Sequence, residues 1–207
     1  RDLGTTRVPL DPNTRDEFDR TILSLTLQRA SSASTTHSLM VGHFREDFVF
    51  EDELDGVVSP PGTFVFDANL LFVAELKRTT VRYSGSTKLP DAPLDVAWGA
   101  QWEKEDLSNV ITGDFENDLQ LDRTSQALFA ELGWQPVEQF SLLLGARAEK
   151  FEGLDWDLTP RFGASLRLAD GRAILRSSVG RAYKAPNLQQ QFVDNPFIVA
   201  NLDIRPE

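Results

Sequence analysis

The sequence predicts an all-β fold, an antiparallel up-and-down meander of about eight strands that belong to a larger transmembrane β-barrel. Apolar and polar residues alternate with a period of two along most of the chain. Many alternating segments run about 11 to 13 residues, whereas strands of globular proteins are mostly about 5 to 6 residues long and a tilted membrane-crossing strand needs about 9 to 11. Short and long connections also alternate, as they do in transmembrane barrels.

The eight predicted strands each carry one apolar and one polar face. They cover residues 20–30, 36–48, 70–86, 94–106, 122–134, 139–152, 158–169 and 172–183. In the first, Leu23, Leu25 and Leu27 alternate with Ser24, Thr26 and Gln28. In the fourth, the apolar positions are Leu94, Val96, Trp98, Ala100 and Trp102. In the sixth, Phe140, Leu142 and Leu144 face away from Arg147 and Glu149.

The connections fall into two sizes. The short ones are 30–35, 89–93, 135–139 and 169–171, and the last contains Asp170-Gly171, a pair that favours a hairpin turn. The longer ones are 48–67, 106–120, 152–156 and the chain after Tyr183, although 152–156 is short for an external loop. Because alternate connections of a meander lie at opposite ends, one end of the sheet is expected to be trimmed and the other elaborated.

Composition excludes several classes of protein. The net charge of -11 argues against binding to nucleic acid, which needs a basic surface. The absence of cysteine removes disulfides and thiolate metal sites. No apolar run is long enough for a transmembrane helix, but a closed barrel needs none. The chain begins at Arg1 without a leader and stops at "NLDIRPE", so we expect a piece of a longer protein.

The stretch "DLTPRFGASLRLADGRAILRSSVGRAYKAPNLQQQF" resembles the barrel of TonB-dependent outer-membrane receptors. Matching pieces follow one another over roughly 126–207: "SQALFAELGWQP", "FSLLLGARAEKF" and "LTPRFGASLRL", and then two motifs. The strand-exit motif is Gly180, Arg181, Tyr183, Lys184, Ala185 and Pro186. The outer-loop motif is Asn195, Pro196, Leu202, Pro206 and Glu207. Residues 1–125 match only as generic barrel strands.

This resemblance implies that residues 1–207 are a partial receptor barrel that lacks the plug domain and the remaining strands. A family barrel has about 22 strands. The parent protein would bind a scarce solute of siderophore, haem, cobalamin or glycan type and import it with energy supplied by TonB. Implied partners are outer-membrane lipid, the receptor's own plug domain, the TonB complex through that plug, and an unidentified small-molecule cargo. The implied location is the cell outer membrane of a Gram-negative bacterium.

Two other functions stay open at this point: a soluble or surface β-sandwich binding module, and a plain porin-like barrel. Neither an enzyme nor a cofactor is predicted, because the sequence holds no nucleophile, metal or phosphate-loop motif. His37 and His43 lie too far apart on an extended strand to share a metal.

The candidate lumen-facing residues are Arg147, Arg161, Arg167 and Arg176, all on polar strand faces. Such arginines can pair with plug carboxylates or favour anionic ligands, or they can form Arg–Glu ladders that only stabilise the wall. At the strand exit, Tyr183 is expected at the lipid interface and Lys184 on its wet side, while Pro186 ends the ladder because it has no amide hydrogen.

Overall fold

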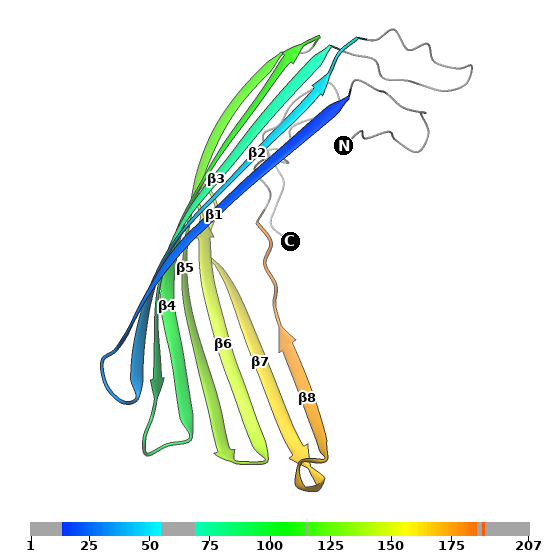
Figure 1. The fold of residues 1–207 in the computed structure, drawn as a ribbon. Coiled ribbons are helices and arrows are strands. Elements are labelled where there is room, and N and C mark those ends of the chain that lie inside the picture. Colours follow the sequence, from blue (N-terminus) through cyan, green and yellow to red (C-terminus); the bar gives the residue numbers. More distant parts are fainter. Residues whose placement is uncertain (1–13, 55–68, 115, 186–187, 189–207) are drawn as a thin grey trace, which may run out of the picture.

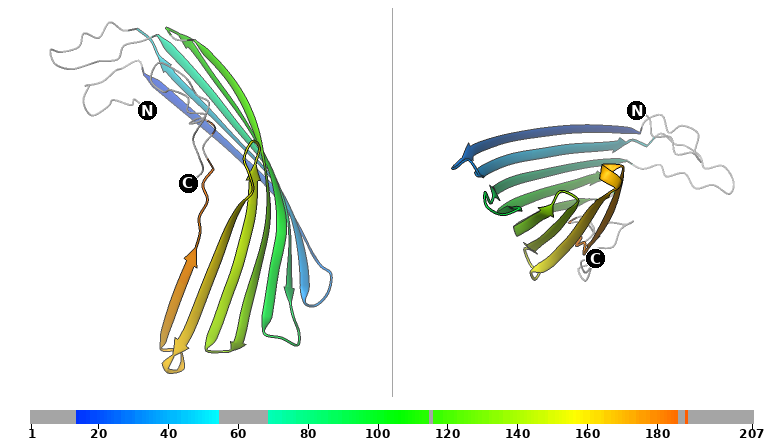
Figure 2. Two further views of the ribbon diagram at one scale, coloured as in Figure 1. Left: turned by 180° about the vertical axis from the view of Figure 1, so that it is seen from behind. Right: turned by 90° about the horizontal axis from the view of Figure 1, so that it is seen from below.

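The structure is a computed structural model that describes residues 14–54, 69–114, 116–185 and Leu188. The described residues form one antiparallel sheet in which each strand pairs with the next along the chain, and the sheet is bent into an arc (Figures 1 and 2). The strands are β1 (Arg15–Ala30), β2 (Thr35–Asp52), β3 (Leu70–Lys88), β4 (Leu94–Gly113), β5 (Asn117–Val137), β6 (Phe140–Phe151), β7 (Asp157–Leu168) and β8 (Ala173–Gly180). The predicted all-β meander of eight strands is therefore confirmed.

The first five strands are longer than the sequence pattern predicts. The predicted long connection at 106–120 is wrong, because β4 and β5 stay paired up to Ile111 and Asn117. Only residues 114–116 separate these two strands. Likewise, β1 begins at Arg15 and β2 continues to Asp52. Backbone pairing therefore continues beyond the point at which the alternation of apolar and polar side chains fades.

The strand register gives the sheet two chemically different faces. One row of paired residues is Leu25, Val41, Val81 and Trp102, and we call this side the apolar face. The neighbouring row is Thr26, Met40, Arg82 and Gln101, and we call this side the charged face because its arginines and glutamates form the network described below. Since side chains alternate between the two sides of a strand, the register assigns every strand residue to one face.

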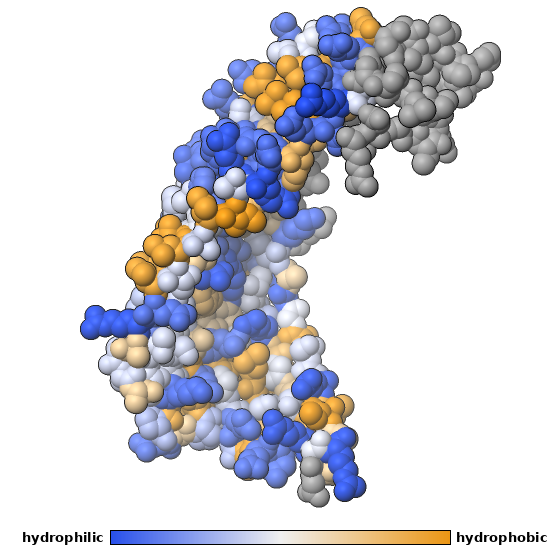
Figure 3. Space-filling view, viewed as in Figure 1, coloured by the Kyte–Doolittle hydropathy of each residue, from blue (hydrophilic) through white to orange (hydrophobic). Residues whose placement is uncertain are grey.

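The apolar face is not covered by any other part of the described structure. Leu25 is 61% exposed and Val179 is 69% exposed, and apolar side chains lie open on the surface seen in Figure 3. Among the described residues, the buried hydrophobic side chains are only Leu107, Ala127 and Leu188. A β-sandwich needs a second sheet to bury such a face, and the described residues contain a single sheet.

The end of the sheet with short connections carries tight turns. Residues 169–171 form a short 3-10 turn between β7 and β8, and Gly171 has a φ of 87°. This agrees with the hairpin turn predicted at Asp170-Gly171, because glycine adopts positive φ without a steric penalty. At the opposite end, most of the connection between β2 and β3 lies outside the described residues.

Glycines inside three strands let neighbouring side chains lie flat on the backbone. A Cβ on Gly99 would lie 2.3 Å from the backbone oxygen of Tyr83 and 2.5 Å from the Phe129 ring. A Cβ on Gly145 would lie 2.7 Å from Nε of Arg161. On the apolar face, Trp98 occupies the same kind of space above Gly85. A strand glycine marks such a close approach.

We predict that Gly99→Ala destabilises the sheet whereas Gly133→Ala is tolerated. The new methyl group at position 99 would overlap backbone as well as the Phe129 ring, while at Gly133 the nearest atom is 3.7 Å away. Overpacking of this kind costs about 1 to 3 kcal/mol. Thermal unfolding of the complete protein in detergent measures both variants, and equal melting temperatures would contradict the proposed close packing.

Candidate functional site

The run of apolar side chains on the apolar face ends at a defined position along the strands. On β4 it runs from Leu94 to Trp102 and is followed by Lys104 and Asp106 on the same face. This span agrees with the roughly 9 to 11 residues that a tilted strand needs to cross a bilayer. Beyond it, the apolar side of β2 to β5 carries a charged belt made of Arg45, Asp47, Glu75, Lys77, Lys104, Asp106 and Asp122.

The charged belt is held by ion pairs between neighbouring strands and along them. Nη2 of Arg45 lies 2.8 Å from Oε1 of Glu75, and Nζ of Lys77 lies 2.6 Å from the other oxygen of Glu75. Nζ of Lys104 lies 3.0 Å from Asp106. Charged groups of this density are costly in hydrocarbon, so the belt marks where the strands leave the apolar layer.

An aromatic cluster lies on the apolar face near the turn between β1 and β2. The rings of Tyr83 and Trp98 meet edge to face with centroids 5.7 Å apart, and the Tyr83 hydroxyl lies 2.8 Å from Nδ1 of His37. His37 also contacts Ser31 in the turn. Amphipathic rings with a polar tip are typical of the membrane interface. His43 contacts Thr79 instead, and no cluster of metal-ligating residues occurs in the part of the chain that the structure describes.

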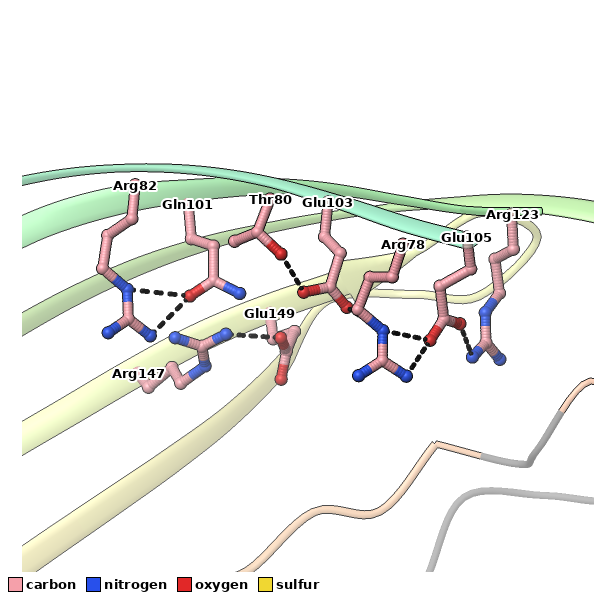
Figure 4. Close-up of polar contacts among 9 residues, drawn as sticks. All are labelled: Arg78, Thr80, Arg82, Gln101, Glu103, Glu105, Arg123, Arg147 and Glu149. Atoms are coloured by element: carbon pink, nitrogen blue, oxygen red, sulfur yellow. Dashed lines mark hydrogen bonds and ion pairs between the residues drawn. The ribbon is translucent and has the colours of Figure 1, made fainter. Parts of the chain in front are cut away.

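The charged face carries a network of arginines and carboxylates (Figure 4). Its centre is Glu105, which accepts hydrogen bonds from two arginines on the flanking strands. Nε and Nη2 of Arg78 lie 2.9 and 2.6 Å from Oε1 of Glu105, and Nη2 of Arg123 lies 2.6 Å from Oε2. The side chains of Glu105 and Arg123 are only 11% and 12% exposed. A largely buried carboxylate shared by two arginines ties β3, β4 and β5 together.

The network continues toward the middle of the sheet. Thr80 donates a hydrogen bond of 2.8 Å to Glu103. Arg82 donates two hydrogen bonds, of 3.0 and 2.7 Å, to the single side-chain oxygen of Gln101. Figure 4 shows these side chains projecting from the same side of the strands. Among the described residues, this arrangement is a charged surface with fixed side-chain positions and no catalytic constellation.

The four arginines singled out from the sequence also lie on the charged face. The register pairs Arg147 with Thr159, Arg161 with Gly145, and Arg176 with Ser165, and the side chains of paired residues lie on the same side of the sheet. Arg147 pairs with Glu149, and Arg161 pairs with Glu131. Arg167 and Arg176 make no ion pair within the described residues. Two of the four therefore form Arg–Glu pairs of the ladder type, and two do not.

The strand-exit motif is tied to the first residues of β7. Nη2 of Arg181 lies 2.7 Å from Asp157, Nη1 donates a hydrogen bond to the carbonyl of Leu158, and the backbone N–H donates to Pro160. Gly180 pairs with Arg161, Lys184 is exposed and Ala185 is half-buried. Pro186 and the outer-loop motif of Asn195, Pro196, Leu202, Pro206 and Glu207 lie outside the described residues.

Tyr183 lies on the charged face, so its expected place at the lipid interface is wrong. Its ring packs on Phe151 of β6 with centroids 6.1 Å apart. The guanidinium carbon of Arg123, on the neighbouring strand β5, lies 4.7 Å from the centroid of the same Phe151 ring. Burial, helped by the carboxylates of Asp157 and Glu149, raises the pKa of the Tyr183 hydroxyl. The alternation of side chains along β8 does not predict the side on which Tyr183 lies, because β8 ends at Gly180, three residues earlier.

Sequence reasoning missed the centre of the network, namely Arg78, Arg82, Glu105 and Arg123. The sequence did contain one sign of this network. Arg78, Thr80 and Arg82 occupy alternate positions of β3, so their side chains lie together on its polar side. A second signal was Gly99, whose missing side chain makes room for Phe129 beside Arg82.

The family model described as "TonB dependent receptor-like, beta-barrel" matches residues 1–207. The chain belongs to this family. TonB-dependent receptors are transporters of the outer membrane, not enzymes. The family assignment also favours a receptor over a soluble sandwich or a plain porin-like barrel.

Three solved structures show the same fold. The copper transporter OprC has a TM-score of 0.74 at 14% identity, with 94% of this chain and 35% of OprC covered. A mutant of the ferric enterobactin receptor PfeA from Pseudomonas aeruginosa has a TM-score of 0.70 at 18% identity, with 86% of this chain and 27% of that chain covered. The siderophore receptor PirA from Pseudomonas aeruginosa has a TM-score of 0.51 at 20% identity, with 96% and 44% covered.

This TonB-dependent receptor barrel segment therefore spans less than half the length of each of these solved chains. A search of curated proteins gave no match. In the described part of the chain, no helix has the length and apolarity to cross a membrane.

We predict that Glu105→Ala strongly destabilises the receptor. The change leaves Arg123, which is nearly buried, without the carboxylate that it contacts at 2.6 Å. Removing one partner of a buried ion pair costs about 3 to 5 kcal/mol. Glu17→Ala is the matched control, because its pair with Arg15 is exposed and worth about 0 to 1 kcal/mol. Similar melting temperatures for the two variants would show that Glu105 does not hold the wall.

We also predict that Asp157→Ala loosens the strand exit. Arg181 then loses its carboxylate partner, so amide hydrogen exchange of residues 181–185 should accelerate. Asp155→Ala is the control, since the structure gives Asp155 no contact with this segment. Unchanged exchange in Asp157→Ala would show that the ion pair does not hold the segment in place.

Proposed function

We propose that this chain forms part of the barrel wall of an outer-membrane active-transport receptor. In this proposal the apolar face contacts lipid, the charged face lines the lumen, and the end of the sheet that carries the long β2–β3 connection points to the cell surface. Cargo bound there is imported with energy supplied by TonB through a plug domain. The single observation that supports the proposal best is the chemical difference between the two faces of the sheet. One face is apolar up to the charged belt, and the opposite face carries a network of charged side chains.

The sheet edges support a larger barrel. Within the described residues, β1 and β8 each pair with one neighbour only, so the outer edge of each presents backbone groups that no described strand pairs. Unpaired backbone groups are not tolerated in hydrocarbon, where barrels span the membrane only when closed. We propose that further strands of the same protein complete the barrel, and that its plug domain occupies the lumen beside Arg147, Arg161, Arg167 and Arg176.

The cargo is proposed only as a class. OprC is a copper transporter, and PfeA and PirA are siderophore receptors. A scarce solute of siderophore, haem, cobalamin or glycan type fits a receptor of this family. The strand-exit and outer-loop motifs are proposed to position the outer loops that meet this cargo, at the cell surface of a Gram-negative bacterium.

Spin labels along β4 of the complete receptor test the proposed orientation. Labels at Val96 and Ala100 on the apolar face should collide mainly with lipid-soluble oxygen. Labels at Ala97 and Gln101 on the charged face should collide mainly with a water-soluble nickel chelate. The two accessibilities should therefore alternate along the strand with opposite phase, because side chains alternate between lipid and lumen.

Labels at Lys104 and Asp106 serve as the internal control, because these residues belong to the charged belt on the apolar side. Their oxygen accessibility should fall and their nickel accessibility should rise relative to Ala100. If Ala100 and Ala97 gave the same accessibilities in proteoliposomes, the membrane-wall proposal would be wrong.

A further inference from the structure

A pocket of about 440 Å³ lies on the charged face and is lined by residues of β3, β5, β6 and β7 and by Arg181, which follows β8. Four arginines line it, namely Arg82, Arg147, Arg161 and Arg181, together with Glu131, Phe129 and Thr159. Arginines therefore outnumber carboxylates among the lining side chains, although the whole chain is acidic. A hollow of this kind attracts anions.

The arginines of the pocket differ in how their charge is compensated. Arg147 pairs with Glu149, Arg161 with Glu131, and Arg181 with Asp157. Arg82 has only the amide oxygen of Gln101, which accepts both of its hydrogen bonds, and it makes no ion pair among the described residues. A neutral acceptor fixes the guanidinium without neutralising it, so the Arg82 charge stays available.

Neighbouring groups hold the side chain of Arg82 in one position. Its guanidinium carbon lies 5.8 Å from the centroid of the Phe129 ring, which itself lies over Gly99. The ring holds one side of the guanidinium, and Nη1 makes no hydrogen bond within the described residues. Arg147 keeps further N–H groups, because only its Nη2 is bonded to Glu149. Free donors on two arginines thus line one pocket.

We propose that this pocket is a carboxylate-binding site in which Arg82 is the principal cation and Arg147 the second. The site rests on the proposed lumenal orientation of the charged face. The carboxylate comes either from a solute in the lumen or from another segment of the receptor itself, since both present the same planar oxyanion to an arginine fork. In the variant Gln101→Glu, the new carboxylate would pair with Arg82 and compete with a carboxylate from either source.

Calorimetric titration of the complete receptor with citrate, at low ionic strength in detergent, tests the site. A solute site predicts that citrate binds to the wild-type protein and that its trimethyl ester does not. Both Arg82→Gln and Gln101→Glu should weaken citrate binding by about tenfold or more, since each removes or neutralises a charge-assisted donor. Arg167→Gln removes an equal charge from the same face outside the pocket and should leave the affinity unchanged.

Thermal unfolding of the same variants separates the two sources. If the receptor supplies its own carboxylate, citrate does not bind, and Arg82→Gln lowers the melting temperature by several degrees whereas Arg167→Gln does not. If neither citrate binding nor the melting temperature responds to Arg82→Gln, or if Arg167→Gln has an equal effect, the site is overturned. The spin-label pattern along β4 is independent of these variants, so a failed pocket and a failed membrane orientation are told apart.

Discussion

The rest of the structure depends on one constraint, which is that backbone hydrogen bonds must be satisfied without water inside a bilayer. A long antiparallel ladder meets this constraint strand by strand, and the register holds without a break from β1 to β5. Once the ladder is fixed, side chains can only alternate, so one side must suit lipid and the other water. This is why the described sheet has few buried hydrophobic residues and yet a consistent arrangement.

The charged face replaces the hydrophobic core as the element that fixes neighbouring strands. Glu105 joins Arg78 on β3 and Arg123 on β5, and Glu131 reaches Arg161 across β6. The last contact exists because Gly145 leaves room for the Arg161 side chain to cross β6. Individually exposed pairs are worth little, but pairs that share a largely buried carboxylate are costly to break. Compensated arginines therefore stiffen the wall, whereas Arg82, bonded to a neutral amide, keeps its charge for another partner.

The sequence predicts the fold well where lipid enforces the pattern and poorly elsewhere. Between Leu94 and Trp102 large apolar side chains fill one face only, so the alternation identifies the strand. Beyond Lys104 the two faces no longer differ clearly in polarity, so alternation no longer distinguishes strand from loop, and the paired residues near Ile111 were predicted as a connection. The pairing of a given arginine was not predictable for a different reason. It depends on cross-strand register, and one strand's sequence does not reveal whether Gln101 or a carboxylate lies opposite Arg82.

Tyr183 shows what the strand-exit motif does in three dimensions. Its ring packs on Phe151, Arg123 covers Phe151 from a neighbouring strand, and Arg123 binds Glu105. A continuous set of contacts thus runs from the segment after β8 to Glu105 on β4, four strands earlier in the chain. Because Arg181 fixes the same segment to Asp157, residues 181–185 leave β8 along the charged face and not along the lipid side. The sequence predicts that the chain leaves the strand at this motif, and the contacts add that it does so over the side of the sheet that carries the arginines.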